Sequence, residues 1–250
     1  MIDERIAERR ADVRDERRRK RLRRTVIVAC AMVVLVALIL IERSPLVGIE
    51  EVEIVGTERL DEDTVRDAAA LELGTSTLRL RLNDVAAQVR DLPLVSDANA
   101  YRANPLTVVI EVSERVPSVV ATGGGQSVLV DREGVVIDEQ SSESLPVINL
   151  DDAPPAVGEH VEEHPALANA HRAWRGLSGP LRVEVVSYEA AGSEDLTLQL
   201  SSGIEVRFGR ADRVDEKVRA LGAVLGDIED ADVTAIDVRA PTAPVVVGAE

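Results

Sequence analysis

The sequence predicts one transmembrane helix followed by an α+β ectodomain that folds in two units. Residues 25–41 form a run without a charged side chain. After this run, the pattern strand, helix, helix, strand, strand gives way to a longer segment in which strands predominate. The length of the uncharged run and the order of the periodic segments are the observations on which this fold class rests.

The uncharged run fits a membrane anchor better than a cleaved signal peptide. A helix over residues 25–41 would rise roughly 25 Å, close to the lower limit for crossing a hydrocarbon core of about 30 Å. A cleaved signal has a shorter apolar region followed by small residues, whereas this run ends in Leu40, Ile41, Glu42 and Arg43. We therefore interpret it as an uncleaved signal anchor, in preference to a cleaved peptide or a buried helix of a soluble protein.

The distribution of charge predicts the orientation of the chain in the membrane. Residues 1–24 contain eleven basic and six acidic side chains, a net charge of +5, which leaves −21 for the rest of a chain of net charge −16. Basic segments stay in the cytoplasm, so the sequence predicts a cytoplasmic tail at 1–24 and an exported C-terminal part. The basic cluster next to the membrane consists of Arg17, Arg18, Arg19, Lys20, Arg21, Arg23 and Arg24. We interpret it as the determinant of topology, with binding of anionic lipid or of a cytoplasmic partner as alternatives.

Composition limits the classes of function open to the exported part. It follows the anchor with enough residues for one large or two small domains, and we favour two. The single cysteine, Cys30, lies inside the predicted anchor, so the exported part is expected to fold without a disulfide. An acidic chain with only one tryptophan, two tyrosines and one phenylalanine offers little for binding nucleic acid, which requires positive charge and base stacking.

The first unit is predicted from periodicity. Apolar and acidic residues alternate around Val52 and Ile54, which is typical of a strand. Two helical patterns follow: one over residues 60–74, capped by Asp61 and closed by Gly74, and one with Asn83 as its N-cap. Two further strands, "VSDANAYR" and "LTVVIEV", flank a turn at residues 103–105 and predict an antiparallel hairpin. Two helices should therefore cover one face of a three-stranded sheet. In the last strand, Val108, Ile110 and Val112 share a face.

These residues resemble a known family. The order of elements directly after a single span, together with "VEIVG", "LPLVSDANAYRANPLTVVIEVSERVPSVV", "VLVDREGVVID" and "LPVI", is similar to the bacterial cell-division family FtsQ/DivIB. The resemblance implies a POTRA domain (β-α-α-β-β) over residues 46–117, a mixed, strand-rich β domain over 118–240 and a C-terminal tail over 241–250. It is strongest from Leu92 to Pro117.

The second unit has its own sequence of elements. The glycine-rich segment "ATGGGQS" is expected to be a flexible joint, and "SVLVDREGVVID" a hairpin. An irregular loop over 149–165 and a helix over 166–177 come next. Three strands, "LRVEVVSY", "LTLQL" and "IEVRF", read as a meander. A helix follows over 214–225, and its helical spacing predicts a buried stripe of Val214, Val218, Leu221 and Leu225. The strand "VTAIDVR" ends the ordered pattern.

No catalytic motif has a suitable context. Residues 160–164 read H-x-x-E-H, the inverted zinc-peptidase motif, which requires both imidazoles one helical turn apart on one face. Pro165, however, disfavours helical angles at His164, so we interpret the stretch as a solvated acidic loop. There is no G-x-S-x-G sequence, and the glycine-rich segment has no phosphate-loop lysine. The sequence therefore predicts a non-enzyme without metal, cofactor or small-molecule substrate.

The resemblance also implies partners and a binding surface. Family members use the terminal strands of the second domain to bind FtsB, with FtsL joining through it, and septal wall synthases of the FtsW/FtsI type are further expected partners. An open sheet edge suits this role, because it presents unpaired backbone groups to another strand. The matching positions here are Thr234, Ala235, Ile236, Asp237, Val238 and Arg239, followed by Val245, Val246 and Val247. The alternative interpretation of 234–239 is a core strand.

The expected role is therefore a scaffold of the divisome, single-pass in the bacterial cell membrane and located at the division septum. It would couple septal peptidoglycan synthesis to division. The alternatives to this role are a POTRA-type membrane-assembly component, an anchored extracytoplasmic hydrolase and a ligand sensor. The sensor is disfavoured because residues 1–24 leave no room for a signalling domain.

Overall fold

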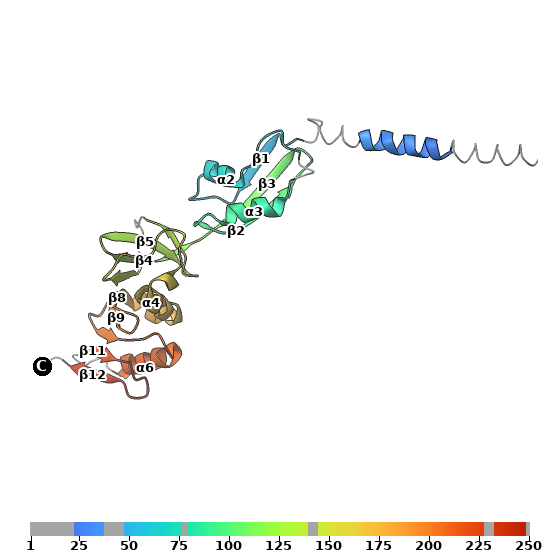
Figure 1. Cartoon of the computed structure of the whole chain (residues 1–250). Helices are drawn as coiled ribbons and strands as arrows, with labels where there is room; N and C mark the ends of the chain where they lie inside the picture. The colour runs from blue at the N-terminus through green and yellow to red at the C-terminus, as the bar shows by residue number, and fades with distance from the viewer. Residues whose placement is uncertain (1–22, 38–47, 77–79, 140–144, 228–232, 249–250) are drawn as a thin grey trace, which may run out of the picture.

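The structure, a computed structural model, describes residues 23–37, 48–76, 80–139, 145–227 and 233–248. Residues 23–37 form a helix, drawn in blue in Figure 1. Most of the predicted basic tail, and residues 38–41 of the predicted anchor, lie outside the described residues. In the described part of the chain, no helix is both long and apolar enough to cross a membrane.

The first unit has the predicted order of elements. They are β1 (Glu51–Val55), α2 (Glu62–Ala69), α3 (Leu82–Arg90), β2 (Val95–Arg102) and β3 (Thr107–Glu114). Among the described residues they form a three-stranded sheet of order β1-β3-β2, in which β3 is parallel to β1 and antiparallel to β2. Val108, Ile110 and Val112, which were predicted to share a face, are all buried. The last two share a core with residues of both helices, including Val65 and Val89.

The ends of the two helices differ from the prediction. The first helix stops at Ala69, because Ala70 adopts a left-handed conformation with φ of 49° and donates its backbone N–H to the carbonyl of Asp67. This closes the helix four residues before Gly74, the predicted cap. The second helix begins at Leu82, with Arg81 in the N-cap position, two residues before the predicted cap at Asn83. Periodicity located both helices, whereas their ends were set by backbone hydrogen bonds.

The second unit is built on a long mixed sheet. Within the described residues it has nine strands in the order β12-β11-β10-β9-β8-β7-β4-β5-β6. The bounds are β4 (Pro117–Gly123), β5 (Gln126–Asp131), β6 (Val136–Asp138), β7 (Val147–Leu150), β8 (Val185–Ala190), β9 (Leu196–Leu200), β10 (Glu205–Arg207), β11 (Val233–Asp237) and β12 (Val245–Gly248). The helices are η2 (Val161–Glu163), α4 (Pro165–Gly176), α5 (Gly179–Glu184) and α6 (Val214–Asp227).

One continuous apolar row crosses six strands of this sheet. Ile148, Tyr188, Leu198, Val206 and Ile236 lie opposite one another in successive strand pairs, from β7 to β11, and each is fully buried. They belong to the large core that also contains Leu167 of α4 and Leu221 of α6. The next residue in the row is Val246 of β12, which is 42% exposed. The buried core therefore ends at β11, and β12 is held mainly by its pairing with β11.

Three expectations for this unit are corrected. Gly124 and Gly125, expected in a flexible joint, form the turn between β4 and β5 inside the sheet. The segment "LRVEVVSY", expected to be a single strand, begins with the helix α5, because Pro180 occupies a first-turn position where proline starts a helix readily. The segment 241–250, expected to be a tail, contains the strand β12. The sheet therefore extends beyond residue 240.

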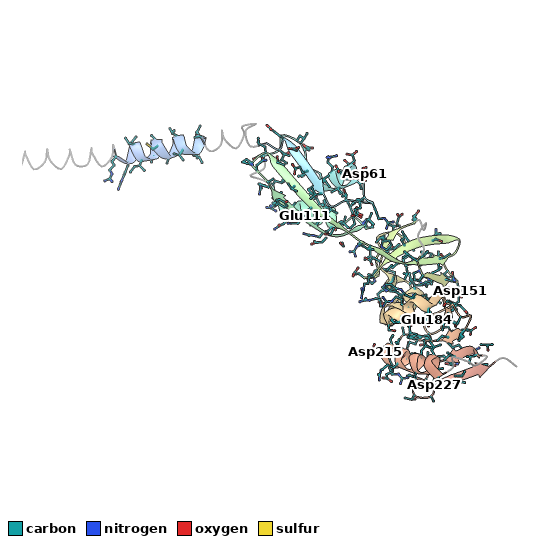
Figure 2. All side chains as sticks on the ribbon, turned by 180° about the vertical axis from the view of Figure 1, so that it is seen from behind. Asp61, Glu111, Asp151, Glu184, Asp215 and Asp227 are labelled. Carbon is teal, nitrogen blue, oxygen red and sulfur yellow. The ribbon has the colours of Figure 1, made fainter. Side chains whose placement is uncertain are left out.

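Acidic side chains are spread along both units (Figure 2). Asp61 and Glu111 lie on the first unit, and the labelled residues of the second unit are Asp151, Glu184, Asp215 and Asp227. Acidic side chains therefore occur along the length of both units.

Glu114, at the end of β3, pins the loop that follows β1. Its carboxylate accepts hydrogen bonds from the backbone N–H groups of Glu58, Arg59 and Leu60, at 2.8 to 3.1 Å. Desolvation raises the pKa of this carboxyl, but the three backbone hydrogen bonds together outweigh it, so the net pKa lies below its ordinary value. The ionised form is therefore the one that the folded loop stabilises.

This arrangement predicts an acid-sensitive loop. A carboxyl with a lowered pKa in the folded state stabilises the fold above its unfolded pKa, and that contribution is lost as the pH falls through the folded value. We expect Glu114→Gln to cost about 1 kcal/mol of unfolding free energy at neutral pH and almost nothing well below pH ~4. Calorimetric melting of both proteins across pH is the measurement. Glu111→Gln, at an exposed position of the same strand, is the control, and an equal loss at every pH would contradict the prediction.

Candidate partner-binding edge

The predicted binding residues come together at one end of the long sheet. Thr234, Ala235, Ile236 and Asp237 belong to β11, Val238 and Arg239 follow it directly, and Val245, Val246 and Val247 form most of β12. The two strands are antiparallel neighbours, with Ile236 opposite Val246 and Asp237 opposite Val245. The hydroxyl of Thr234 also donates to the carbonyl of Val247 at 3.2 Å.

The pairing of β11 narrows the candidate site to β12. β11 lies between β10, to which it is parallel, and β12, so both of its edges are occupied. Ile236 and Val238 are fully buried and serve as core residues. In β12, by contrast, Val245, Val246 and Val247 are 57%, 42% and 43% exposed. The outer edge of β12 is therefore the part of this region that a second chain could reach.

The opposite end of the same sheet is less accessible. At β6, the backbone N–H of Val136 donates to the carbonyl of Glu159, and the N–H of Gly158 donates to the carbonyl of Val136. These bonds tie the 156–161 segment along that edge, a common way of blocking an exposed strand. β12 ends the other side of the sheet as an apolar strand of three valines and a glycine, which favours it as the receiving edge.

An ion pair fixes the chain as it leaves β11. The Arg239 guanidinium contacts the Asp237 carboxylate at 2.6 to 3.0 Å through two nitrogens, and the Arg239 backbone N–H donates to the same carboxylate. The hydrogen bond from the Arg239 side chain is the largest of the effects that lower the pKa of Asp237. Asp237 also lies opposite Arg207 of β10. Charged side chains therefore lie at the ends of β11, which neighbours the candidate edge, and of β10 beyond it.

Two buried polar side chains hold the loop on which Arg239 rests. Asn169 of α4 donates to the carbonyl of Gly209 at 3.0 Å and accepts from the N–H of Ala211 at 2.6 Å. Lys217 of α6 donates to the carbonyls of Phe208 and Arg210 at 3.1 and 2.6 Å and contacts Asp212 at 3.1 Å. A Cβ at Gly209 would lie 2.9 Å from the Cγ atom of Arg239. Both helices thus support the end of the candidate edge.

Sequence reasoning missed this support. The apolar stripe of α6 was predicted from Val214, Val218 and Leu221, and Lys217 lies on the same face without having been singled out. A lone lysine in an apolar stripe could have indicated this support, because a buried lysine needs several oxygen acceptors. For Asn169 no local pattern exists, since its partners lie about forty residues further along the chain.

We expect Lys217→Met to destabilise the second unit. Methionine matches the length of the lysine stem, but it leaves the carbonyls of Phe208 and Arg210 and the Asp212 carboxylate without their donor. This loss should cost about 2 kcal/mol. Chemical denaturation followed by the fluorescence of Trp174, the only tryptophan in the chain, measures the loss. Arg219→Met, at an exposed position on the same helix, should change stability by less than about 0.5 kcal/mol. Equal effects of the two variants would refute the role given to Lys217.

The H-x-x-E-H motif does not form a metal-binding geometry. Nδ1 of His160 accepts the N–H of Glu162, and Nε2 of His160 contacts the carbonyl of Glu133 at 3.0 Å. Nδ1 of His164 accepts the N–H of Leu167 and caps α4. Between the two histidines lies the short helix η2 rather than a full helical turn on one face. Across the described ranges, no group of three or more potential ligands is placed to hold a metal.

The basic cluster is only partly within the described residues. Arg23 and Arg24 are exposed at the start of the helix over residues 23–37. The other five members, Arg17, Arg18, Arg19, Lys20 and Arg21, lie outside the described residues.

Comparison with known proteins accounts for both units. The family model "POTRA domain, FtsQ-type" matches residues 47–115, and the model "Cell division protein FtsQ/DivIB, C-terminal" matches residues 118–239. The chain belongs to the FtsQ/DivIB family. In FtsQ/DivIB terms the first sheet with its two helices is the POTRA domain, and the second match ends at Arg239, just before the segment that contains β12.

Relatives with the family name match over most of the chain. The cell division protein FtsQ of Streptomyces bingchenggensis is 28% identical over 238 residues, which cover 92% of this chain and 89% of that protein. The FtsQ proteins of Mycobacterium leprae and Mycolicibacterium smegmatis are 31% and 30% identical over 182 and 220 residues. These alignments cover 73% and 87% of this chain, but only 52% and 63% of the mycobacterial proteins.

Proposed function

We propose that this member of the FtsQ/DivIB family is a non-catalytic scaffold of the bacterial divisome that links septal wall synthesis to division through protein contacts. The observation that carries the proposal is that the two family models follow one another over residues 47–115 and 118–239. The relatives that match the chain are called cell division proteins. In the described residues the one catalytic-looking motif is engaged in capping backbone groups, which supports a role without chemistry.

The proposed partner surface is the outer edge of β12. A strand of a small FtsB-type division protein would add to this edge by backbone hydrogen bonds, with FtsL joining through it and the FtsW/FtsI synthases acting further along. The exposed valines at 245–247 supply apolar contacts on both faces of the added strand, and the Asp237–Arg239 pair supplies charge beside its end.

The proposed topology places the edge outside the cell. Residues 25–41 act as a single signal anchor, residues 1–24 stay in the cytoplasm, and the acidic units are exported. The uncharged run and the net charge of +5 in the segment before it support this arrangement.

A fluorescent protein fused to the N-terminus and expressed at native level in dividing source cells tests the function. We expect a band at midcell that appears before constriction begins. A uniform membrane signal through the whole cell cycle would refute the division role. A matched fusion in which residues 245–247 are exchanged for serine separates recruitment from partner binding. It should still produce the anchored protein but fail to support constriction when it replaces the parent.

A further inference from the structure

The joint between the POTRA domain and the second domain is closed by a buried ion pair. Arg115 follows β3, and its Nη1 donates to Oδ2 of Asp131 in β5 at 2.6 Å. The side chain of Arg115 is 20% exposed and that of Asp131 is fully buried. Nε of the same guanidinium donates to the carbonyl of Val95 in β2 at 3.1 Å. One side chain therefore bonds both domains at once.

Asp131 is held rigidly by its own domain. Its Oδ1 accepts the N–H groups of Gly134 and Val135 at 2.7 and 2.8 Å, which closes the turn between β5 and β6. Its backbone carbonyl lies 3.1 Å from Nε2 of the buried His171 in α4. The carboxylate thus has a fixed position, and a charged pair in a fixed, water-poor setting is far more directional than a surface pair.

An apolar contact accompanies the ion pair. Leu94, which precedes β2, packs against the cluster formed by Val120, Leu129 and Ile137 on β4, β5 and β6. This cluster is separate from the large core that includes α4 and α6. In Figure 1 the POTRA domain meets the second domain at the end of the sheet where β4 and β5 lie. The POTRA domain therefore covers an apolar surface that the second domain's own helices leave open.

The connection itself is short and tied down. Only Arg115 and Val116 separate the end of β3 from the start of β4 at Pro117. The N–H of Arg115 donates to the carbonyl of Leu94 at 2.7 Å, and the ring of Pro117 restricts its own φ. The glycines that would give freedom, Gly124 and Gly125, lie in a hairpin turn within the second domain and cannot act as a hinge between the domains.

We propose that the POTRA domain and the second domain form one rigid body, latched by Arg115 and Asp131 and seated on Leu94. The orientation of the β12 edge relative to the POTRA domain is then fixed by the joint. A displacement of either domain is transmitted to the other without being absorbed between them. This inference concerns the molecule alone and stands or falls independently of the division role.

Distances between spin labels on the two domains test the proposal. The full chain in detergent micelles, with Cys30→Ala, is labelled at Asp67→Cys in α2 and Ala223→Cys in α6, both exposed helix positions. We expect a single narrow distance distribution. With Arg115→Gln and Leu94→Ser added, the distribution should widen at least about twofold, because neither the ion pair nor the apolar seat remains. A broad distribution in the parent protein, or an unchanged width in the variant, would overturn the proposal.

Two controls separate a loose joint from a damaged domain. Arg90→Gln breaks a surface pair with Asp97 inside the POTRA domain and should leave the width unchanged. Labels at Ser193→Cys and Ala223→Cys, both in the second domain, should keep a narrow distribution in the latch variant. If this intradomain distribution also widens, the variant has unfolded its domain. In that case the test rests on the width of the interdomain distance distribution in the parent protein, and a broad distribution there would refute the rigid joint.

Discussion

Asp131→Ala is expected to lower the free energy of unfolding of the second domain by about 3 kcal/mol, because it leaves a partly buried arginine unpaired. The substitution also removes the acceptor of two turn N–H groups. Asp131 is fully buried, so bulk water does not reach the groups that lose their acceptor. The expected effect is therefore several times that of an ordinary surface pair.

Trp174 reports this loss directly. Its ring stacks on His171 at 5.5 Å between centroids, and His171 contacts the backbone of Asp131. Denaturant titration followed by tryptophan fluorescence should give a lower midpoint for Asp131→Ala. Arg90→Ala, which removes an exposed pair with Asp97, should cost less than about 1 kcal/mol. A cost for Asp131→Ala as small as that of the control would show that the ion pair contributes little.

Val246→Pro is expected to weaken capture of an FtsB-type partner strongly while leaving the core of the second domain folded. Proline lacks the N–H group and is tolerated poorly inside a paired strand, so β12 either loses an outward donor or detaches from β11. All four residues of β12 are exposed, and Trp174 fluorescence should therefore show an unchanged denaturation midpoint. Capture of the partner by the purified protein should fall by at least about tenfold, equivalent to ~1.4 kcal/mol.

Val246→Thr is the matched control for the edge. Threonine keeps the N–H group and the β-branched shape that suits a strand, so partner capture should be close to that of the parent. Normal capture by Val246→Pro would move the partner site away from β12. Equal losses by both variants would assign the effect to the side chain rather than to the backbone.

Hydrophobic periodicity and turn residues predicted the helices and strands that depend on residues close together in sequence. The alternation in β3 gave the shared face of Val108, Ile110 and Val112, all of which are buried, and the stripe of α6 gave Leu221. The turn at residues 103–105 gave the hairpin of β2 and β3, in which the Asn104 side chain accepts from the N–H of Leu106 at 2.8 Å. In each case the residues that decide the structure are close together in sequence, so the sequence pattern is enough to predict the element.

Features that depend on residues far apart in sequence could not be predicted from hydrophobic periodicity or turn residues. The apolar residues of "LRVEVVSY" fit a strand, but Ser178 and Pro180 start a helix before β8 begins. Glycines in "ATGGGQS" indicate a turn, and only the pairing of β4 with β5 places that turn inside the sheet. The ion pair between the domains joins Arg115 to Asp131. The hydrogen bonds of Asn169 join α4 to residues 209–211. Tertiary contacts decided these outcomes.

The candidate edge was predicted in part from the sequence, and the structure supplied the rest. The positions came from the family resemblance, and the structure pairs the two segments as adjacent strands. It also assigns them different roles, since Ile236 is a core residue and Val246 is exposed. Sequence alone gave no reason to prefer residues 245–247 over 234–239.

Photo-crosslinking from β12 in dividing cells tests the central claim most directly. A photoreactive residue in place of Val247, at the exposed edge, is compared with one in place of Asp67, an exposed position of the POTRA domain. The account predicts an adduct with a small single-pass division protein of the FtsB type from position 247 and none of that size from position 67. An adduct with this partner from position 67, with none from position 247, would contradict it.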